Sequence, residues 1–201
     1  IQNNRFCLPD AEAAKAAENY LDQKSAECDS VGGVVECVIS GLPVGLGEPV
    51  FEKLDANLAK AILSIGAVKG FEIGDGFAAT KACGSENNDE FRMDGDKIVK
   101  ETNHAGGVLG GISDGSDVVF RAAFKPTPSI AKSQETVTKD GENIDLVIHG
   151  RHDPVVVPRA VVVVESMAAI TAMDMLLVSM TSRLDLIQLF FQVENADDGD
   201  N

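Results

Sequence analysis

The chain has 201 residues and a formal net charge of −15. This length suits one domain or two small ones with a real hydrophobic core, which aliphatic side chains must supply because the sequence has no Trp and a single Tyr. The acidic charge argues against general binding to nucleic acid or to an anionic membrane, since both need a basic surface. A few local Arg and Lys side chains could still hold an anionic small molecule.

The four cysteines lack a CxxC motif and the spacing of a metal site, so free thiols in a reducing cytoplasm are expected. No signal peptide is visible, and the chain begins with Ile1 rather than Met, which indicates a fragment or a processed product. The most apolar segment, residues 155–182, is interrupted by charged side chains. No membrane span is therefore expected.

The first part of the chain is predicted to alternate helices with strands. Asp10 should cap an alanine-rich helix that runs to about residue 24. The β-branched run 34–40 and the alternating run 67–73 are typical of strands. Between them, Pro49 should open an amphipathic helix to about residue 65, because apolar side chains recur there at spacings of three and four. The members of this apolar face are Phe51, Leu54, Leu58, Ile62 and Ile65.

The middle of the chain is poorer in regular structure. Residues 84–97 are polar and predict a mobile surface loop that could act as a lid. Residues 103–115 form a glycine-rich loop, and residues 117–124 should form another strand. A hairpin is expected over residues 136–148, with its turn at Asp140-Gly141.

A long helix is expected next, through Glu165 to about Arg183, and its apolar sequence suggests a buried core element with four methionines as packing side chains. Residues 193–201 carry four acids and no base, which predicts a disordered tail after a folded portion of residues 1–192. Strands outnumber crossover helices in the second half. The fold class is therefore predicted to be α+β, with helices packed on a mostly antiparallel sheet.

Two glycine- or proline-rich segments could bind an anion. The glycine pairs in 106–111 allow the backbone to approach a ligand, and free N–H groups can cradle a phosphate. The spacing is not that of a dinucleotide fingerprint or a P-loop, and a flexible or tightly packed loop is the alternative. The turn at 125–129 joins a cation to two hydroxyls and suits an anion, but taken alone it is better explained as an ordinary loop with a solvated Lys125.

Arg151, His152 and Asp153 stand immediately before the long helix. They could form a charge-relay cluster, but side chains of adjacent loop residues usually diverge. The alternative is that Asp153 caps the helix while Arg151 lies on the surface. The three histidines lack a supporting spacing, so no metal site is predicted.

Taken together, six segments resemble chorismate synthases from about residue 7 to about residue 177. They are DSVGGVVE at 29–36, GLPVGLGEP at 41–49, AVKGFEIG at 67–74, NHAGGVLGGIS at 103–113, KPT at 125–127, and GRHDP at 150–154 with PRA at 158–160 and Glu165.

The resemblance implies an enzyme that converts 5-enolpyruvylshikimate 3-phosphate to chorismate and phosphate by a 1,4-elimination that requires reduced FMN. It also implies helices sandwiched between antiparallel sheets, two similar halves and a cytoplasmic homotetramer. It places Asp153 near nitrogen 5 of the flavin, where it assists proton removal. The positions that it implies for lining FMN are Gly66, Ala67, Gly110, Lys125, Pro126, Thr127, Pro128, Ser129 and Arg151.

Two departures from the family pattern matter. The Gly-Glu-Ser-His-Gly and Arg-x-Ser-Ala-Arg-Glu-Thr motifs, which supply both histidines that the family uses as acids, do not occur here. Many members also have cysteine at the position of Val155. The chain therefore looks like the C-terminal part of the enzyme and is expected to be inactive alone. Two alternatives are a non-catalytic folding and oligomerisation unit and a different flavin-binding module.

Overall fold

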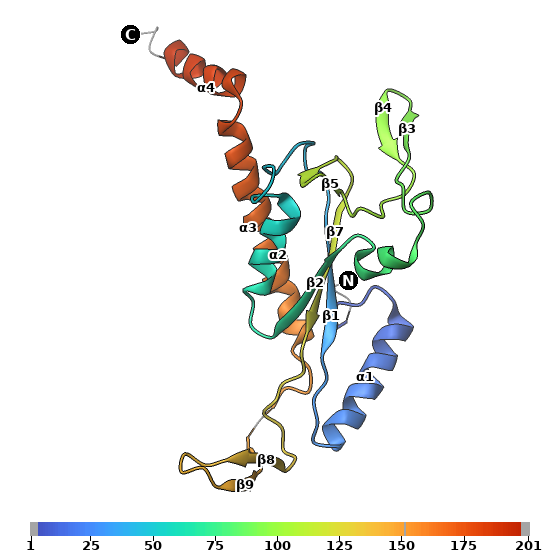
Figure 1. The fold of residues 1–201 in the computed structure, drawn as a ribbon, viewed down its shortest axis with the longest axis vertical. Coiled ribbons are helices and arrows are strands. Elements are labelled where there is room, and N and C mark those ends of the chain that lie inside the picture. The colour runs from blue at the N-terminus through green and yellow to red at the C-terminus, as the bar shows by residue number, and fades with distance from the viewer. Residues whose placement is uncertain (1–3, 151, 198–201) are drawn as a thin grey trace. The chain divides into compact units, whose positions relative to one another are not determined.

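The structure is a computed structural model that describes residues 4–150 and 152–197. Its elements are α1 (Ala11–Ala26), β1 (Gly33–Ile39), α2 (Leu54–Leu63), β2 (Val68–Ile73), the 3₁₀ helix η1 (Gly76–Lys81), β3 (Phe91–Asp94), β4 (Lys97–Lys100), β5 (Val108–Leu109), β6 (Ile112–Ser113), β7 (Val118–Phe124), β8 (Gln134–Val137), β9 (Asn143–Leu146), α3 (Val157–Thr181) and α4 (Leu184–Asp197) (Figure 1). Helices and antiparallel strand pairs occur together, which confirms the α+β class.

The described residues divide into two compact units, and each is considered by itself. Unit 1 contains the residues up to 35, together with 63–71 and 121–164. Unit 2 contains 36–62, 72–120 and the residues from 165 onward. The boundaries between the units fall inside β1, α2, β2, β7 and α3, so neither unit is a simple continuous segment of sequence.

The main sheet has three strands in the order β1-β7-β2. In unit 1 the Lys125 N–H donates to the Ala67 carbonyl at 2.9 Å, and a side chain added at Gly70 would meet Ala123. Since 67 faces 125 while 70 faces 123, β2 and β7 run antiparallel there, as predicted. The central strand β7 buries every second residue, as alternation along a strand requires. These residues are Val118, Phe120, Ala122 and Phe124.

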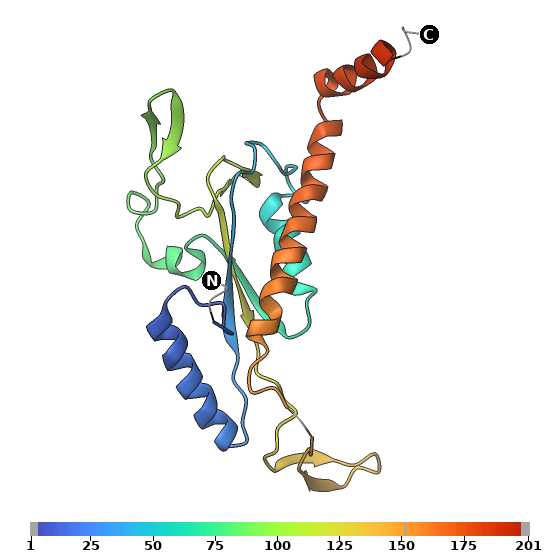
Figure 2. The same ribbon diagram turned by 180° about the vertical axis from the view of Figure 1, so that it is seen from behind.

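Helix α1 begins as the sequence predicts. The carboxylate of Asp10 accepts hydrogen bonds from the N–H groups of Glu12 at 2.7 Å and Ala13 at 3.2 Å, so Asp10 is the N-cap. Figure 2 shows this helix in blue near the N-terminus. Its residues Ala14 and Leu21 are buried, and the remaining residues are half-buried or exposed. Local capping chemistry, rather than a wide apolar face, therefore determines where this helix starts.

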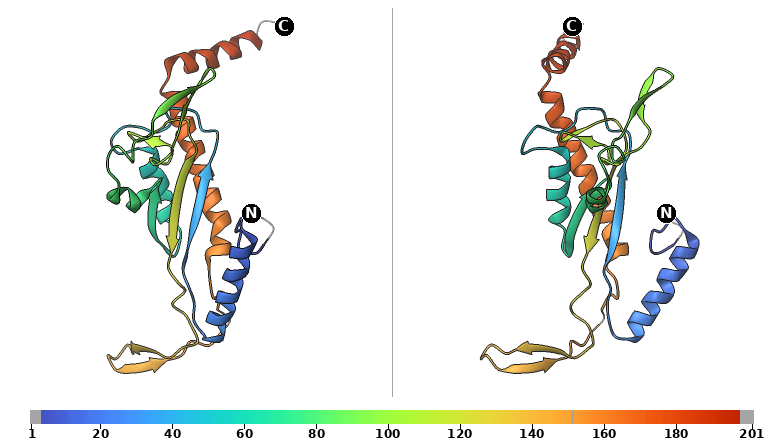
Figure 3. Two further views of the ribbon diagram at one scale, coloured as in Figure 1. Left: turned by 90° about the vertical axis from the view of Figure 1, so that its right-hand side faces the viewer. Right: turned by 45° about the vertical axis from the view of Figure 1, so that its right-hand side comes forward.

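Helix α2 begins at Leu54, which is later than the predicted start at Pro49. The Leu54 N–H donates to the Gly111 carbonyl at 2.8 Å, and Glu48 N–H donates to the Glu52 carbonyl, so residues 48–52 form a turn instead. Phe51 is consequently exposed and does not belong to the apolar face. In unit 2, α2 lies beside the later part of α3, where Asn57 Nδ2 is 3.8 Å from Met175 Sδ (Figure 3).

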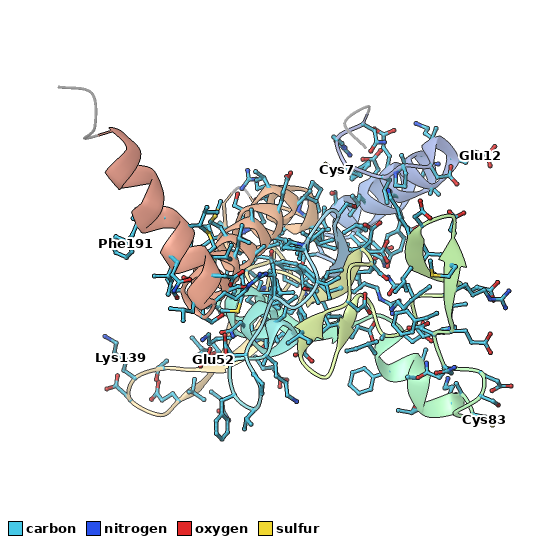
Figure 4. The ribbon with its side chains drawn as sticks, turned by 90° about the horizontal axis from the view of Figure 1, so that it is seen from above. Cys7, Glu12, Glu52, Cys83, Lys139 and Phe191 are labelled. Atoms are coloured by element: carbon cyan, nitrogen blue, oxygen red, sulfur yellow. The ribbon has the colours of Figure 1, made fainter. Side chains whose placement is uncertain are left out.

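The predicted mobile loop at 84–97 is only partly a loop. Strands β3 and β4 pair antiparallel, with Phe91 opposite Lys100 and Asp94 opposite Lys97 (Figure 1). The loop prediction was wrong here because strand pairing needs only backbone groups, which a polar composition does not reveal. The hairpin predicted over residues 136–148 is confirmed: β8 and β9 pair antiparallel, and Lys139 lies at the end of the hairpin (Figure 4).

Helix α3 extends from Val157 to Thr181, and the separate helix α4 was not predicted. Part of the expected tail, 193–197, is helical, and residues 198–201 lie outside the described residues. The expectation that α3 is buried was wrong, since burial follows one stripe only. This stripe comprises Ala160, Val164, Ala168, Thr171, Ala172 and Met175. Among the exposed side chains are Val162, Ile170, Met173, Leu177 and Met180.

By length and composition, α3 is the one helix of the described residues that could cross a membrane. This is weak evidence, because the core helix of a soluble protein meets the same criteria. The helix also carries Arg159, Glu165 and Asp174, which are costly in a bilayer.

Candidate functional site

Within unit 1, the ends of β2 and β7 bring two of the predicted cofactor-binding segments together. Ala67 precedes β2 with a φ of 71°, a conformation that is uncommon for a residue with a side chain, and its carbonyl accepts the hydrogen bond from Lys125. Gly66 is exposed, and no atom lies where its side chain would be. The Lys125 ammonium group forms no ion pair with any of the described residues, so it remains available to an anion.

The turn from Lys125 to Ser129 is held in place by the turn at 29–33. The Ser30 hydroxyl donates to the Thr127 carbonyl at 2.6 Å, and Lys132 Nζ lies 2.6 Å from a carboxylate oxygen of Asp29. Pro126 and Pro128 are exposed, while Thr127 and Ser129 are half-buried. The contact between these turns was not predicted, because they lie nearly a hundred residues apart in the sequence.

Asp153 is close to unit 1 residues far away in the sequence. The Val31 N–H donates to the Pro154 carbonyl at 2.8 Å, and Val31 and Val155 form an isolated parallel bridge. A cavity of about 180 Å³ is lined by Asp29, Ser30 and Asp153 together with seven other residues. Asp153 therefore lies beside the turn that supports the Lys125 segment.

The carboxylate of Asp153 forms an ion pair with Arg159 at 2.6 Å. Helix α3 begins at Val157, so the N-cap position belongs to Val156 and the capping alternative for Asp153 was wrong. His152 Nε2 lies 3.2 Å from the Ile148 carbonyl, within a hydrogen bond to the backbone. Arg151 lies outside the described residues, and its role as an FMN ligand stays a prediction.

Gly110 belongs to unit 2, in the two-residue turn between β5 and β6. Gly110 and Gly111 have φ values of 61° and 91°, as a tight hairpin turn of the primed type requires. No atom occupies the space where a Gly110 side chain would project. Gly107 is different, since a side chain there would come within 2.5 Å of the Asp117 carbonyl oxygen. One part of the glycine-rich segment is thus tightly packed, and another is open.

Sequence reasoning missed a buried polar cluster in unit 2, centred on Asp89. The Asp89 carboxylate accepts from the Thr102 hydroxyl at 2.7 Å, from the N–H groups of His104 and Ala105 at 2.8 and 2.9 Å, and from Lys100 Nζ at 3.3 Å. His104 Nδ1 lies 2.9 Å from the same carboxylate. Asp89 falls in the segment that was predicted to be a loop, and nothing local distinguishes it from its acidic neighbours.

The contacts of this cluster favour ionised carboxylates. Burial alone would raise the pKa of Asp89, but hydrogen bonds from Ala105, Thr102 and His104, with the charge of Lys100, hold that pKa far below its ordinary range. Burial likewise opposes ionisation of Asp114, yet its hydrogen bond from Lys100 lowers the pKa of this carboxyl. The cluster is therefore a cation between two anions.

Comparison with known proteins agrees with the α+β class of the fold. The sequence model described as chorismate synthase matches residues 1–177. Chorismate synthase of Lachnoclostridium phytofermentans is 63% identical over 188 residues, which cover 93% of this chain and 51% of the relative. That of Agathobacter rectalis is 63% identical over 192 residues, covering 96% and 52%.

A solved structure titled "Crystal Structure of Chorismate Synthase" resembles this chain with a TM-score of 0.71 and 33% identity, covering 86% of this chain and 45% of that one. The chain belongs to the chorismate synthase family. It spans about half the length of the curated relatives that it matches.

Proposed function

We propose that this chain is part of a chorismate synthase, a lyase of aromatic amino acid biosynthesis that converts 5-enolpyruvylshikimate 3-phosphate to chorismate and phosphate. The observation that carries the proposal is the 63% identity to chorismate synthases across more than nine-tenths of the chain. The reaction removes a proton and a phosphate group across a conjugated system and leaves one new ring double bond.

The residues of unit 1 fit an anionic cofactor such as FMN. An exposed Lys125, the hydroxyl-bearing Thr127 and Ser129, and the positive-φ backbone at Ala67 lie on connected strand ends. These groups suit a phosphate or a flavin carbonyl, and exposed Gly66 offers no steric obstacle nearby. Considered by itself, the β5–β6 turn of unit 2 leaves open space beside Gly110, which suits the FMN contact proposed for this glycine. When bound, reduced FMN would supply electron density as phosphate leaves.

The carboxylate of Asp153 would handle the proton that the substrate loses. Its ion pair with Arg159 keeps the carboxylate oriented, and its position beside the cavity leaves it partly accessible to solvent. Proton transfer by a placed carboxylate contributes typically ~100- to 10,000-fold to a rate. Arg151, a cation two residues before Asp153 in the sequence, would add to the binding of the anionic cofactor.

The proposal extends to the assembly. The protein would be a cytoplasmic homotetramer, and other copies would cover apolar faces such as the exposed side of α3. It would need neither nucleic acid nor a membrane as a partner, in keeping with the net charge of −15.

The direct test is turnover. The full-length protein should produce chorismate from 5-enolpyruvylshikimate 3-phosphate under anaerobic conditions with reduced FMN, as measured by the absorbance of chorismate. The matched control is the same reaction without reductant, which should give none. Phosphate release without chorismate, or no reaction at all, would contradict the proposal.

A second candidate applies to the 201-residue chain alone, which would be a folding and oligomerisation unit without activity. Its support is that the chain spans about half the length of its relatives. Turnover by this chain in the same assay would exclude that candidate.

A further inference from the structure

Lys100, the last residue of β4, is a buried cation with three acceptors. Its side chain is 2% exposed, and its ammonium group lies 2.7 Å from Asp114, 3.1 Å from Asn103 and 3.3 Å from Asp89. A buried charge is costly unless it is paired and hydrogen-bonded, and these three oxygens match the three N–H donors of a lysine. Lys100 is therefore fully partnered at a precise position in unit 2.

Two of these acceptors lie on either side of the β5–β6 hairpin. Asn103 precedes β5, and its side-chain oxygen also accepts from the Gly107 N–H at 2.8 Å. Asp114 directly follows β6, and its own N–H donates to the Gly107 carbonyl at 3.1 Å. Lys100 consequently joins the chain that enters the hairpin to the chain that leaves it.

The third acceptor fixes the segment that leads into the hairpin. Asp89 receives the N–H groups of His104 and Ala105 as well as the ammonium of Lys100. Without the cation, Asp89 and Asp114 would be two buried carboxylates with 3% and 7% exposed side chains and no shared counter-charge. Their repulsion and desolvation would favour displacement of the segments that hold them.

We infer that Lys100 is a positioning residue for cofactor binding: through Asn103, Asp89 and Asp114 it holds the β5–β6 hairpin where Gly110 meets FMN. The inference rests on the proposed function, because the contact of Gly110 with FMN is part of it. A glycine has no side chain that could adjust to a displaced ligand. The contribution of Gly110 to FMN affinity therefore depends on the position of its backbone.

The test is FMN titration of the full-length protein, followed by flavin fluorescence. Lys100→Met keeps an unbranched, slightly shorter side chain and removes its charge, and it should raise the dissociation constant of FMN about tenfold with an unchanged number of sites. A purely structural role would lower the number of competent sites and leave the affinity of the remainder unchanged. The matched control is Lys97→Met, at an exposed position of the same strand, which should bind FMN as the wild type does.

Asp114→Asn is the second variant, since it removes one charge facing Lys100 and preserves shape. It should raise the dissociation constant of FMN less than Lys100→Met does. If Lys100→Met does not fold, the FMN affinity of Asp114→Asn tests the inference by itself. Wild-type affinity in both variants, or an equal loss in Lys97→Met, would overturn the inference alone. A wild-type protein that does not bind FMN would overturn the proposed function and this inference with it.

Discussion

At the scale of single residues, the structure distinguishes between the two roles predicted for Asp153, helix capping and proton transfer. The structure excludes it from the N-cap of α3 and gives it Arg159 as a partner. Both side chains are substantially exposed, at 35% and 76%, and exposed ion pairs contribute only ~0–1 kcal/mol to stability. The ion pair of Asp153 thus contributes little to folding stability, and its carboxylate is accessible for proton transfer.

We therefore expect Asp153→Asn in the full-length protein to lower turnover by about 100-fold or more and to weaken FMN binding much less, because an amide cannot take up the proton. Steady-state kinetics and FMN titration measure the two effects. Arg159→Met breaks the same ion pair but keeps the carboxylate, so its loss of turnover should be smaller. Equal losses of turnover and FMN affinity in Asp153→Asn would assign it a structural role.

Asp89 makes a pH-dependent contribution to stability whose sign follows from its pKa. The folded-state pKa lies below the ordinary value of 3.8, so the folded protein favours the ionised form. The stabilisation is complete above the ordinary carboxyl range and is lost as the pH falls towards the folded-state pKa. At neutral pH the ionised Asp89 carboxylate therefore contributes its full stabilisation.

Asp89→Asn should lower the urea midpoint of unfolding at pH 7 and make that midpoint depend less steeply on pH between about 5 and 2. The control is Asp96→Asn, at the exposed turn of the β3–β4 hairpin. An unchanged slope in Asp89→Asn would show that other carboxyl groups carry the acid sensitivity.

At the scale of elements, a helix starts where the sequence provides an N-capping side chain. Where that side chain is missing, tertiary contacts determine the first residue of the helix. Helix α1 starts behind Asp10, as the sequence predicts. Helix α2 has a suitable proline at position 49, yet the hydrogen bond from Leu54 to Gly111 delays its start. The apolar spacing identified the helix but could not reveal that its first residues would form a turn.

Asp10→Ala should destabilise unit 1 by ~0.5–2 kcal/mol, because two N–H groups at the start of α1 lose their acceptor. Urea unfolding followed by circular dichroism measures this difference. Asp22→Ala, in the interior of the same helix, should be neutral or slightly stabilising, since alanine is the better helix former. If the two variants unfold alike, the cap does not contribute.

At the scale of the whole molecule, many side chains that the sequence marks as core are exposed. On β1, Val34 and Val38 are 59% and 52% exposed, and Phe191, which projects from α4 in Figure 4, is 57% exposed. The chain also spans about half the length of its relatives. These exposed apolar side chains fit the proposal that the active protein is longer and assembles from several copies.

The sequence by itself determined the cap of α1, the alternation of β7, the turn of the β8–β9 hairpin and the family. Each of these depends on neighbouring residues or on motifs that are read in order. Only the tertiary structure decided that Ser30 supports Thr127, that Asp153 pairs with Arg159 and that Lys100 joins Asp89 to Asp114. The physical reason is that periodicity reports which side chains are apolar, whereas the partner of a charge depends on which distant segments the fold brings within hydrogen-bonding distance.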